Sequence, residues 1–354
     1  MKSDEVKKIY QQNESKFEQL RTTVFGIIQN ALKSGNLEHL PIESRVKKVD
    51  SCLEKIAKKK YSNPIEEMTD WVAFRVIVYL ESDIKKASET LSDLFEIDVK
   101  NSIDKLTPDK VNEVGYRSYH LVCSLGSGRA QLPEYDGLSE LKFEVQIRTV
   151  LQHAWAEIEH KRNYKGKSTL PQELQRRLMT AAGTLEILDK VFSDIAKDAE
   201  LYAAEVEQEN ENVASDPINA IALIATYNKT LKKNGYHFKN INFGDEKLAD
   251  KVVSELSRFG VNSITELQEL INNNDAEALL RIHASLGKLP SAAGFFRHAM
   301  IISDPERYFR EAFDNNFQRM KAETIDFLNA LSKRDDIEQL ATNAGVEIRD
   351  NREN

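Results

Sequence analysis

The segment with the clearest chemical potential is Leu141 to Arg148, in which apolar and polar residues alternate without a break. As a strand, this segment puts its apolar residues on one face and four polar residues on the other, namely Lys142, Glu144, Gln146 and Arg148. Alternation alone describes a half-exposed strand with a solvated polar face. A functional interpretation of Glu144 and Gln146 therefore depends on the other polar segments of the chain.

A second segment, Trp71 to Leu80, is apolar except for the charge of Arg75. A central strand tolerates such a charge only where a partner or a ligand compensates it. Asp70 stands at the start of this run, and by itself it reads as an ordinary turn residue. Strict alternation places Asp70 and Arg75 on opposite faces, so both reach one site only if the chain bends near Trp71.

A third segment contains Lys47, Ser51 and Lys55 at intervals of four residues. On a helix these residues form one stripe, in which two ammonium groups flank a hydroxyl. Such a stripe can line a polyphosphate, although lysine-rich helix faces are more commonly just solvated. The sequence thus leaves both interpretations open for this stripe.

Two further segments carry polar or aromatic groups. In the run Gly115 to His120, Tyr116 could stack on a base or simply fill a core. After Arg148, a zinc site can be drawn from His153, Glu157 and His160, but no second cluster completes it. A solvated helix face is the preferred reading of these three residues.

Composition sets limits on the class of protein. The chain has 354 residues, which suggests two domains, and a net charge of −8, which argues against a general coating of nucleic acid. Only two cysteines occur, Cys52 and Cys123, so no disulfide framework is expected. Without a signal peptide or an apolar run of about 20 residues, we expect a cytoplasmic protein and no membrane role.

The pattern along the chain predicts an α+β fold followed by an all-helical domain. Strands are expected at 71–80, 119–125 and 141–148, with helical structure over residues 1–60 before them and from 149 to about 199 after them. Residues 205–216 are acidic and are expected to be a linker between a domain at 1–204 and a helical domain at 217–354. Helix starts are expected at Asp216-Pro217 and Asp304-Pro305, and a capping box at Ser263.

These segments together resemble the RelA/SpoT synthetase family. The family motif Arg-x-Lys-x3-Ser-x3-Lys is matched by Arg45, Lys47, Ser51 and Lys55, and its motif Asp-x4-Arg is matched by Asp70 and Arg75. Further motifs are matched by Gly115 to His120, by Glu144 to Thr149, and by Trp155 to Lys165. Five motifs in the family's order cover about residues 40–200 and leave 205–354 unexplained.

The resemblance implies a nucleotidyltransferase-like mixed β-sheet flanked by helices, and an alarmone synthetase activity. Such enzymes move the β,γ-pyrophosphate of ATP to the 3′-hydroxyl of GDP or GTP. By resemblance, ATP would be bound by Arg45, Lys47, Ser51, Lys55 and Arg75. Asp70 and Glu144 would hold Mg²⁺ and carry catalysis, and the acceptor nucleotide would contact Tyr116, Gln146 and His153.

Some features depart from the family or leave alternatives open. Ala73 stands where the family usually has glycine, and no His-Asp dipeptide of a hydrolase half occurs, so we expect a short, synthetase-only member. One alternative is a toxin-like relative that modifies the 3′ end of tRNA or adenine nucleotides. Another is an inactive nucleotide-binding module. The helical domain would regulate the enzyme or assemble it into a homo-oligomer.

Overall fold

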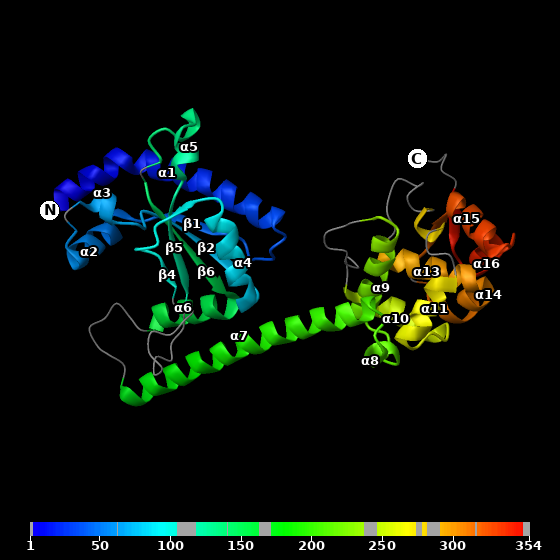
Figure 1. Ribbon diagram of the computed structural model, residues 1–354. Coiled ribbons are helices and arrows are strands. Elements are labelled where there is room, and N and C mark those ends of the chain that lie inside the picture. The colour runs from blue at the N-terminus through cyan, green and yellow to red at the C-terminus, as the bar shows by residue number, and fades with distance from the viewer. Residues whose placement is uncertain are drawn as a thin grey trace. The chain divides into compact units, whose positions relative to one another are not determined.

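The computed structural model describes residues 3–61, 63–104, 118–139, 141–162, 171–236, 246–273, 278–281, 291–315 and 317–349. The chain divides into two compact units, residues 1–195 and 196–354 (Figure 1). The division falls within α7 (Gln172–Glu207). Each unit has its own buried apolar core, and the two are described separately below.

The first unit is built on a six-stranded sheet with the order β1-β2-β6-β5-β3, in which β4 also pairs with β5. Its strands are β1 (Glu43–Val46), β2 (Val72–Val78), β3 (Glu96–Ile97), β4 (Ile103–Asp104), β5 (Tyr119–Ser124) and β6 (Phe143–Thr149). The neighbours β2 and β6 run parallel, and the other pairs are antiparallel. The sheet is therefore mixed, as the resemblance implies.

One face of this sheet is apolar and is covered by α1 (Ser3–Ser34) and α4 (Glu81–Ser92). Residues of β6 alternate between buried and half-buried, because Phe143, Val145 and Ile147 all point into this core. Phe17 of α1 stacks on Trp71, with ring centroids 4.9 Å apart. The remaining helices are α2 (Val49–Lys59), α3 (Pro64–Glu67), α5 (Gly126–Ala130), α6 (Val150–Arg162) and a 3₁₀ turn at Pro133–Tyr135.

The three predicted strands are confirmed as β2, β5 and β6, but the helical prediction for residues 1–60 is wrong at one place. Residues Glu43–Val46 form β1, an edge strand antiparallel to β2. Lys47 and Lys48 follow in extended conformation, and α2 begins only at Val49. Lys47 therefore lies ahead of the helix on which Ser51 and Lys55 lie, and the predicted stripe begins outside it.

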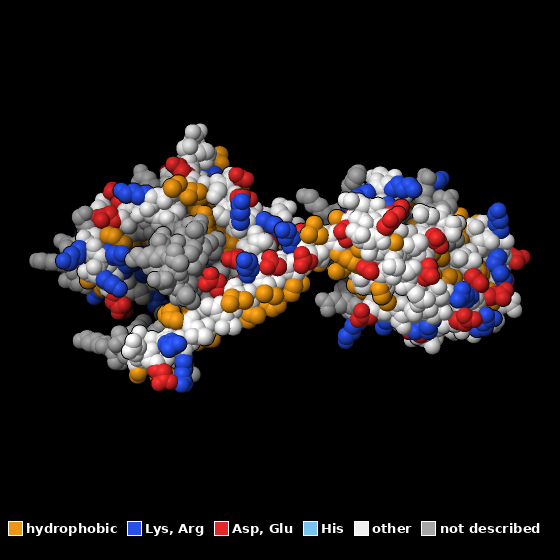
Figure 2. Space-filling model, turned by 60° about the horizontal axis from the view of Figure 1, so that its bottom comes forward, with side chains coloured by type: hydrophobic (Ala, Val, Ile, Leu, Met, Phe, Trp, Pro, Cys, Tyr) orange, Lys and Arg blue, Asp and Glu red, His pale blue; other side chains and the backbone are white. Residues whose placement is uncertain are grey.

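Helix α7 presents a row of exposed apolar side chains, visible as an orange band in Figure 2. Ile187, Val191 and Ile195 repeat at intervals of four residues and are 65%, 43% and 57% exposed. On another side of the helix, the buried Asp189 accepts a hydrogen bond of 2.7 Å from the Thr149 hydroxyl. This bond joins α7 to the end of β6.

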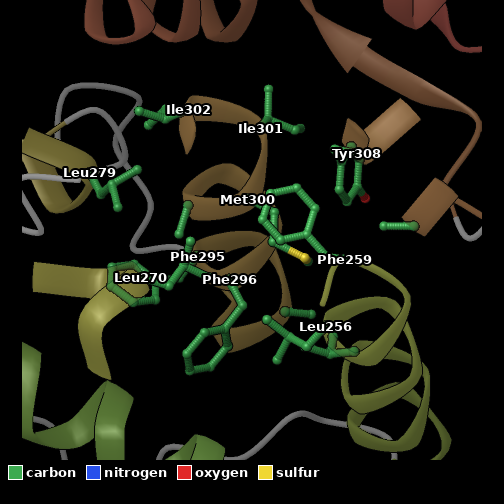
Figure 3. Close-up of a cluster of buried hydrophobic side chains, with 14 of the residues drawn as sticks. Leu256, Phe259, Leu270, Leu279, Phe295, Phe296, Met300, Ile301, Ile302 and Tyr308 are labelled. Atoms are coloured by element: carbon green, nitrogen blue, oxygen red, sulfur yellow. The ribbon is translucent and has the colours of Figure 1, made fainter. Parts of the chain in front are cut away.

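The second unit is mainly helical, as expected. Its helices are α8 (Glu211–Ala214), α9 (Ala220–Lys233), α10 (Glu246–Arg258), α11 (Ile264–Asn273), α13 (Ala292–Ser303), α14 (Pro305–Arg307), α15 (Ala322–Ser332) and α16 (Ile337–Asn343), with a π-helical turn at Tyr308–Ala312. Phe295, Phe296 and Met300 of α13 lie within its core (Figure 3). The prediction of an all-helical domain omitted a short parallel pair, β7 (Arg319–Lys321) and β8 (Glu347–Arg349).

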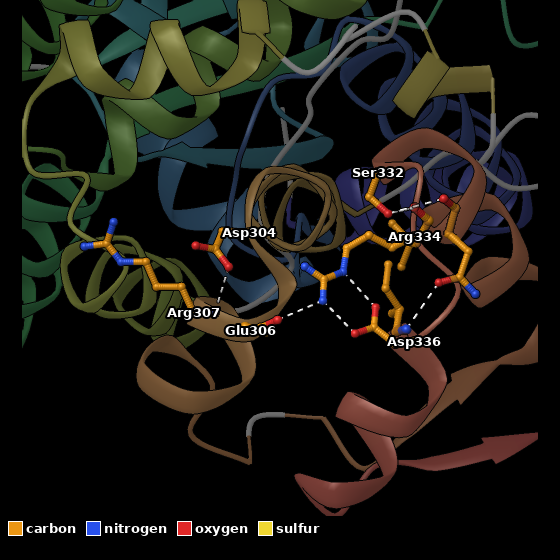
Figure 4. Close-up of polar contacts among 9 residues, drawn as sticks. Asp304, Glu306, Arg307, Ser332, Arg334 and Asp336 are labelled. Carbon is orange, nitrogen blue, oxygen red and sulfur yellow. Dashed lines mark hydrogen bonds and ion pairs between the residues drawn. The ribbon is translucent and has the colours of Figure 1, made fainter.

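Helix caps in this unit agree in part with the sequence. Ser263 and Glu266 form the predicted capping box, and Asp304 accepts a hydrogen bond from the Arg307 N–H (Figure 4). The predicted start at Asp216-Pro217 is early, because α9 begins at Ala220 with Asn219 as its cap. Nearby, Arg334 pairs with Asp336 and with Glu306, at 2.6 and 2.8 Å (Figure 4).

The segment predicted as an acidic linker, 205–216, has regular structure. It contains the end of α7 and the short helix α8. Val206 and Val213 are buried in a small cluster with Ala222, Ala225 and Ile264. These two apolar side chains pack the segment against the rest of the second unit, although the composition of the segment is mostly polar.

Both cysteines of the chain are fully buried in the first unit. Burial raises the pKa of the Cys52 thiol to about 11 and that of Cys123 to about 12. Among the described residues, no helix is long and apolar enough to cross a membrane.

Candidate active site

The polar face of the sheet gathers four of the predicted site residues, because strand register aligns Arg45, Arg75, Glu144 and Gln146 in two rows. One row runs through Arg45, Ala73 and Glu144, which are neighbours on β1, β2 and β6. The next row runs through Glu43, Arg75, Gln146 and His120, on β1, β2, β6 and β5. Residues that are register partners project on the same face of a sheet, so these side chains lie side by side.

Asp70 lies in a turn just before β2. It is therefore not part of the strand alternation that would place Asp70 and Arg75 on opposite faces. Its carboxylate binds two lysines, since Lys47 Nζ is 2.6 Å from Oδ2 and Lys55 Nζ is 2.8 Å from Oδ1. The side chains of Lys47 and Asp70 are only 15% and 16% exposed. The turn and the start of α2 thus bring together three predicted residues that are up to 23 positions apart in the chain.

Glu144 is the centre of a second polar cluster. The Gln146 side-chain amide donates to its Oε1 at 2.6 Å, and His120 Nδ1 lies 2.9 Å from the same oxygen. His120 Nε2 is in turn 2.5 Å from the hydroxyl oxygen of Ser118. Burial would raise the pKa of the Glu144 carboxyl, but the hydrogen bonds and charge of His120, the Gln146 bond and the charge of Lys55 lower it to about 2. The carboxylate is therefore ionised at neutral pH.

A pocket of about 240 Å³ opens at the β1 side of this face, and its lining includes Arg45, Ala73, Arg75 and Gln146. Ala73 has a small side chain and leaves room between the two arginines. Planar guanidinium groups on either side of such a space can stack on an aromatic ring. Arg75 is held by two carboxylates, Glu43 at 3.1 Å and Glu157 of α6 at 3.2 Å.

The other predicted residues are less closely joined to these clusters. Ser51 is exposed on α2, next to the lysines in sequence. His153 is half-buried on α6, and its Nδ1 is buried without a hydrogen-bond partner in the described structure. Tyr116 lies outside the described residues. The structure therefore places Glu144, Gln146 and both arginines on one face of the sheet and joins Asp70 to Lys47 and Lys55 in a second cluster. It leaves the acceptor-binding prediction for Tyr116 open.

Three residues of this face received no role from the sequence. His120 contacts Glu144, and Glu43 and Glu157 contact Arg75. His120 is the last residue of the motif Gly115 to His120, and this position was the signal in the sequence that could have identified it. On β5, His120 lies opposite Gln146 of β6. Arg75 and Glu157 are 82 residues apart, and spacing along the chain does not reveal such a contact.

The donor chemistry of the face fits a hard divalent cation such as Mg²⁺. Asp70 Oδ1 is buried and lies 2.8 Å from the Lys55 ammonium, and it accepts no hydrogen bond from the described residues, so it remains available as a ligand oxygen. Asp70 and Glu144 supply carboxylate oxygens, which Mg²⁺ prefers, together with water and substrate phosphates. Over the described ranges, no three or more His, Cys, Asp or Glu side chains group as a metal site. Two carboxylates would thus require phosphate or water oxygens to complete the coordination.

Comparisons with known proteins agree with this geometry. The family described as "Region found in RelA / SpoT proteins" matches residues 44–169. The chain is 35% identical over 162 residues to GTP pyrophosphokinase YjbM from Bacillus subtilis, which is 45% of this chain and 74% of that protein. It is 31% identical over 169 residues to GTP pyrophosphokinase YwaC from the same organism, covering 46% and 77% of the two chains.

Among solved structures, small alarmone synthetase 1 from Bacillus subtilis is 30% identical, with a TM-score of 0.44, over 56% of this chain and 98% of that one. The mixed sheet with arginines and Glu144 on its polar face, together with the Asp70–lysine cluster, belongs to the class of nucleotide-dependent transferases. The identity and coverage of the two GTP pyrophosphokinases place the chain more narrowly, and it belongs to the RelA/SpoT family.

Proposed function

We propose that this protein is a (p)ppGpp synthetase that transfers the β,γ-pyrophosphate of ATP to the 3′-hydroxyl of GDP or GTP. The names of its two relatives, both GTP pyrophosphokinases, support this reaction. The resemblance of five motifs to the synthetase family supports the assignment of residues. ATP and a guanine nucleotide are accordingly the proposed substrates.

One observation carries the proposal: two lysines, Lys47 and Lys55, both bind the carboxylate of Asp70. The Lys55 ammonium lies 2.8 Å from Asp70 Oδ1, and its charge is also among the causes that lower the pKa of Glu144. Pyrophosphoryl transfer depends mainly on placing positive charge around a polyphosphate and on positioning the attacking hydroxyl. Two lysines at one carboxylate, in the unit whose sheet carries Glu144 and a pocket with two arginines, provide the components for both tasks.

In the proposed reaction, the acceptor 3′-oxygen attacks the β-phosphorus of ATP, the bond to the α-phosphate oxygen breaks, and AMP leaves. Arg45 and Arg75 would stack on the adenine, while Lys47, Ser51 and Lys55 would bind the phosphates. Glu144 would accept the proton of the 3′-hydroxyl. Because its pKa is about 2 with His120 beside it, Glu144 is a weak base, and the imidazole would have to share that proton. Gln146 and His153 would orient the acceptor, with Tyr116 stacked on its base.

Asp70 and Glu144 would hold Mg²⁺, which supplies charge neutralisation to the transferred pyrophosphate. In the structure, Lys47 and Lys55 neutralise the charge of Asp70. When ATP binds with Mg²⁺, these lysines would turn from Asp70 to the phosphates, and the Asp70 carboxylate would become available to hold the cation.

The test is a transfer assay with ATP labelled in its γ-phosphate, Mg²⁺, and one acceptor at a time: GDP, GTP, AMP or bulk tRNA. We expect label in ppGpp or pppGpp. Glu144→Gln keeps the size of the side chain and removes its charge, so transfer should fall by about 10²-fold or more.

Each other outcome of this assay identifies an alternative. Label on AMP or on the 3′ end of tRNA would replace the proposal with the toxin-like activity. ATP binding without transfer to any acceptor would leave an inactive nucleotide-binding module. Full activity in a folded Glu144→Gln protein would remove the catalytic role of that residue.

A further inference from the structure

A cavity of about 280 Å³ lies in the second unit, far in sequence from every residue of the candidate active site. It is bordered by α13, by α15 and by the β7 segment between them. Its described lining comprises Ser291, Gly294, Arg297, His298, Ile301, Phe317, Arg319, Met320, Lys321 and Thr324. Ligand pockets for small molecules begin at about this size.

The lining is basic. Three of its residues are arginine or lysine, one is His298, and none of its described members is acidic. Arg297 has its charge balanced by a bidentate ion pair with the buried Glu255, at 2.7 and 2.8 Å. Arg319 pairs with Glu347 at 3.1 Å, where both side chains are more than half exposed, so this pair offsets little of its charge.

Strand register brings a second positive charge near Lys321. Lys321 of β7 and Arg349 of β8 are direct register partners, and Arg349 has only an exposed ion pair of 3.3 Å with Glu347. Like charges directly opposite in a sheet are destabilising. An anion bound beside Lys321 would remove this repulsion.

Two helices also begin at the cavity. Ser291 caps α13, and Lys321 occupies the cap position of α15 without supplying a side-chain acceptor. The N-termini of helices carry unpaired N–H groups and a partial positive charge, which favour anions. Thr324, in the first turn of α15, is 7% exposed and lines the cavity, and its hydroxyl has no partner among the described residues. The N-termini of two helices and the Thr324 hydroxyl therefore border the same cavity.

The rest of the lining is apolar or aromatic. Ile301 and Met320 contribute aliphatic surface, and the Arg297 guanidinium lies 5.5 Å from the centre of the Phe317 ring. A bare inorganic ion would leave these side chains facing empty space. A ligand with both a phosphate and a small apolar portion would use both parts of the lining.

We propose that this cavity binds a small organic phosphate, with the phosphate at the N-termini of α13 and α15 beside Lys321 and its apolar portion against Phe317, Ile301 and Met320. The second unit is then a ligand-binding domain. This inference does not depend on which acceptor the first unit uses.

The experiment uses the full chain with ¹³C-labelled histidine rings, and the His298 resonance is assigned with a His298→Gln variant. His298 lines the cavity, so it reports local binding even where a probe also reaches the first unit. The probes are inorganic phosphate and phenyl phosphate, with chloride at matched ionic strength as a control. We expect a saturable shift with both phosphates, and about tenfold tighter binding of phenyl phosphate because its ring is buried.

Variants connect the shift to the proposed donors. Lys321→Gln should weaken phenyl phosphate binding about tenfold, and Thr324→Val, which keeps the side-chain shape, should weaken it severalfold. Lys251→Gln, on the exposed side of α10, makes the same charge change away from the cavity and should have less than a twofold effect.

Three results would overturn the proposal. One is a His298 resonance that neither phosphate shifts in a saturable way. Another is a shift that survives unchanged in Lys321→Gln and Thr324→Val. Equal affinity for inorganic and phenyl phosphate would show that the apolar half of the lining takes no part, and would rule out the organic ligand.

Discussion

Asp70 is paired with two lysines that the proposed reaction assigns to ATP. Its two oxygens are occupied by Lys47 and Lys55, the same side chains that would hold the phosphates of ATP. An ion pair that is mostly buried holds its members in place until another charge replaces it. ATP without a cation must therefore compete with Asp70 for the lysines.

The variant Asp70→Asn separates the two roles of this residue. Without the carboxylate charge the lysines are released, so ATP without Mg²⁺ should bind about 3- to 10-fold more tightly. Transfer should nevertheless fall by about 10²-fold or more, since a cation ligand is lost. Calorimetric titration with ATP in the presence of a chelator, and the transfer assay, measure these opposite effects.

Asp50→Asn is the matched control, because Asp50 is an exposed acid on α2 close to the same lysines. It should change neither ATP affinity nor transfer by more than about twofold. Weaker binding of chelated ATP by Asp70→Asn would mean that Asp70 positions the lysines for ATP and does not compete with it.

At the residue scale, the sequence predicts the members of the face better than their contacts. Alternation in Leu141 to Arg148 correctly separates Glu144 and Gln146 from the buried residues, because a strand has a strict period of two. For Glu157, the sequence indicates only a position on a predicted helix. Its contact with Arg75 depends on how α6 packs beside β2. Long-range packing of this kind is not encoded in local spacing.

At the element scale, short and edge elements were the ones missed. The four residues of β1 carry no apolar alternation strong enough to distinguish them from the helix before and after, and pairing with β2 is what makes them a strand. For the same reason the three-residue strands β7 and β8 could not be predicted. The longer strands β2 and β6 were found because each buries a full set of apolar side chains.

The contact between β6 and α7 offers a test of what holds these elements together. Asp189→Ala removes the acceptor of the Thr149 hydroxyl, and both residues are buried. Leaving a buried hydroxyl without its charged partner should lower the free energy of unfolding of the first unit by about 1–3 kcal/mol. Urea denaturation followed by the fluorescence of Trp71 and Trp155 measures this change.

The control is Asp194→Ala, which makes the same substitution at an exposed position of the same helix. Any gain in helix propensity is shared by the two variants, so their difference isolates the buried contact. Asp194→Ala should stay within about 0.5 kcal/mol of the unsubstituted protein. Equal effects of the two substitutions would show that the Thr149 contact adds nothing to stability.

At the scale of the whole molecule, two separate cores indicate two independently folding units. All proposed catalytic residues belong to the first, and we propose that the second regulates the enzyme or assembles it. A chain ending at residue 195 keeps the complete first core and the Thr149–Asp189 contact. We expect it to fold, bind ATP and transfer pyrophosphate, with a specific activity that differs from that of the full chain.

Specific activity and mass in solution, measured on both chains, separate the two roles. A changed rate at unchanged mass supports regulation, whereas a changed mass with unchanged specific activity supports assembly into a homo-oligomer. A truncated chain that is folded and binds ATP but transfers nothing would show that the second unit helps to build the active site.

The burial of Cys52 and Cys123 has a practical consequence for spectroscopy. Thiols with pKa values of about 11 and 12 are almost entirely protonated at neutral pH and react slowly with maleimides. Cysteines introduced at Lys85 on α4, whose side chain is 83% exposed, and at Lys251 on α10 would therefore take up dyes selectively without removal of the native thiols. Energy transfer between the two dyes would report directly, in solution, how the distance between the units responds to each nucleotide.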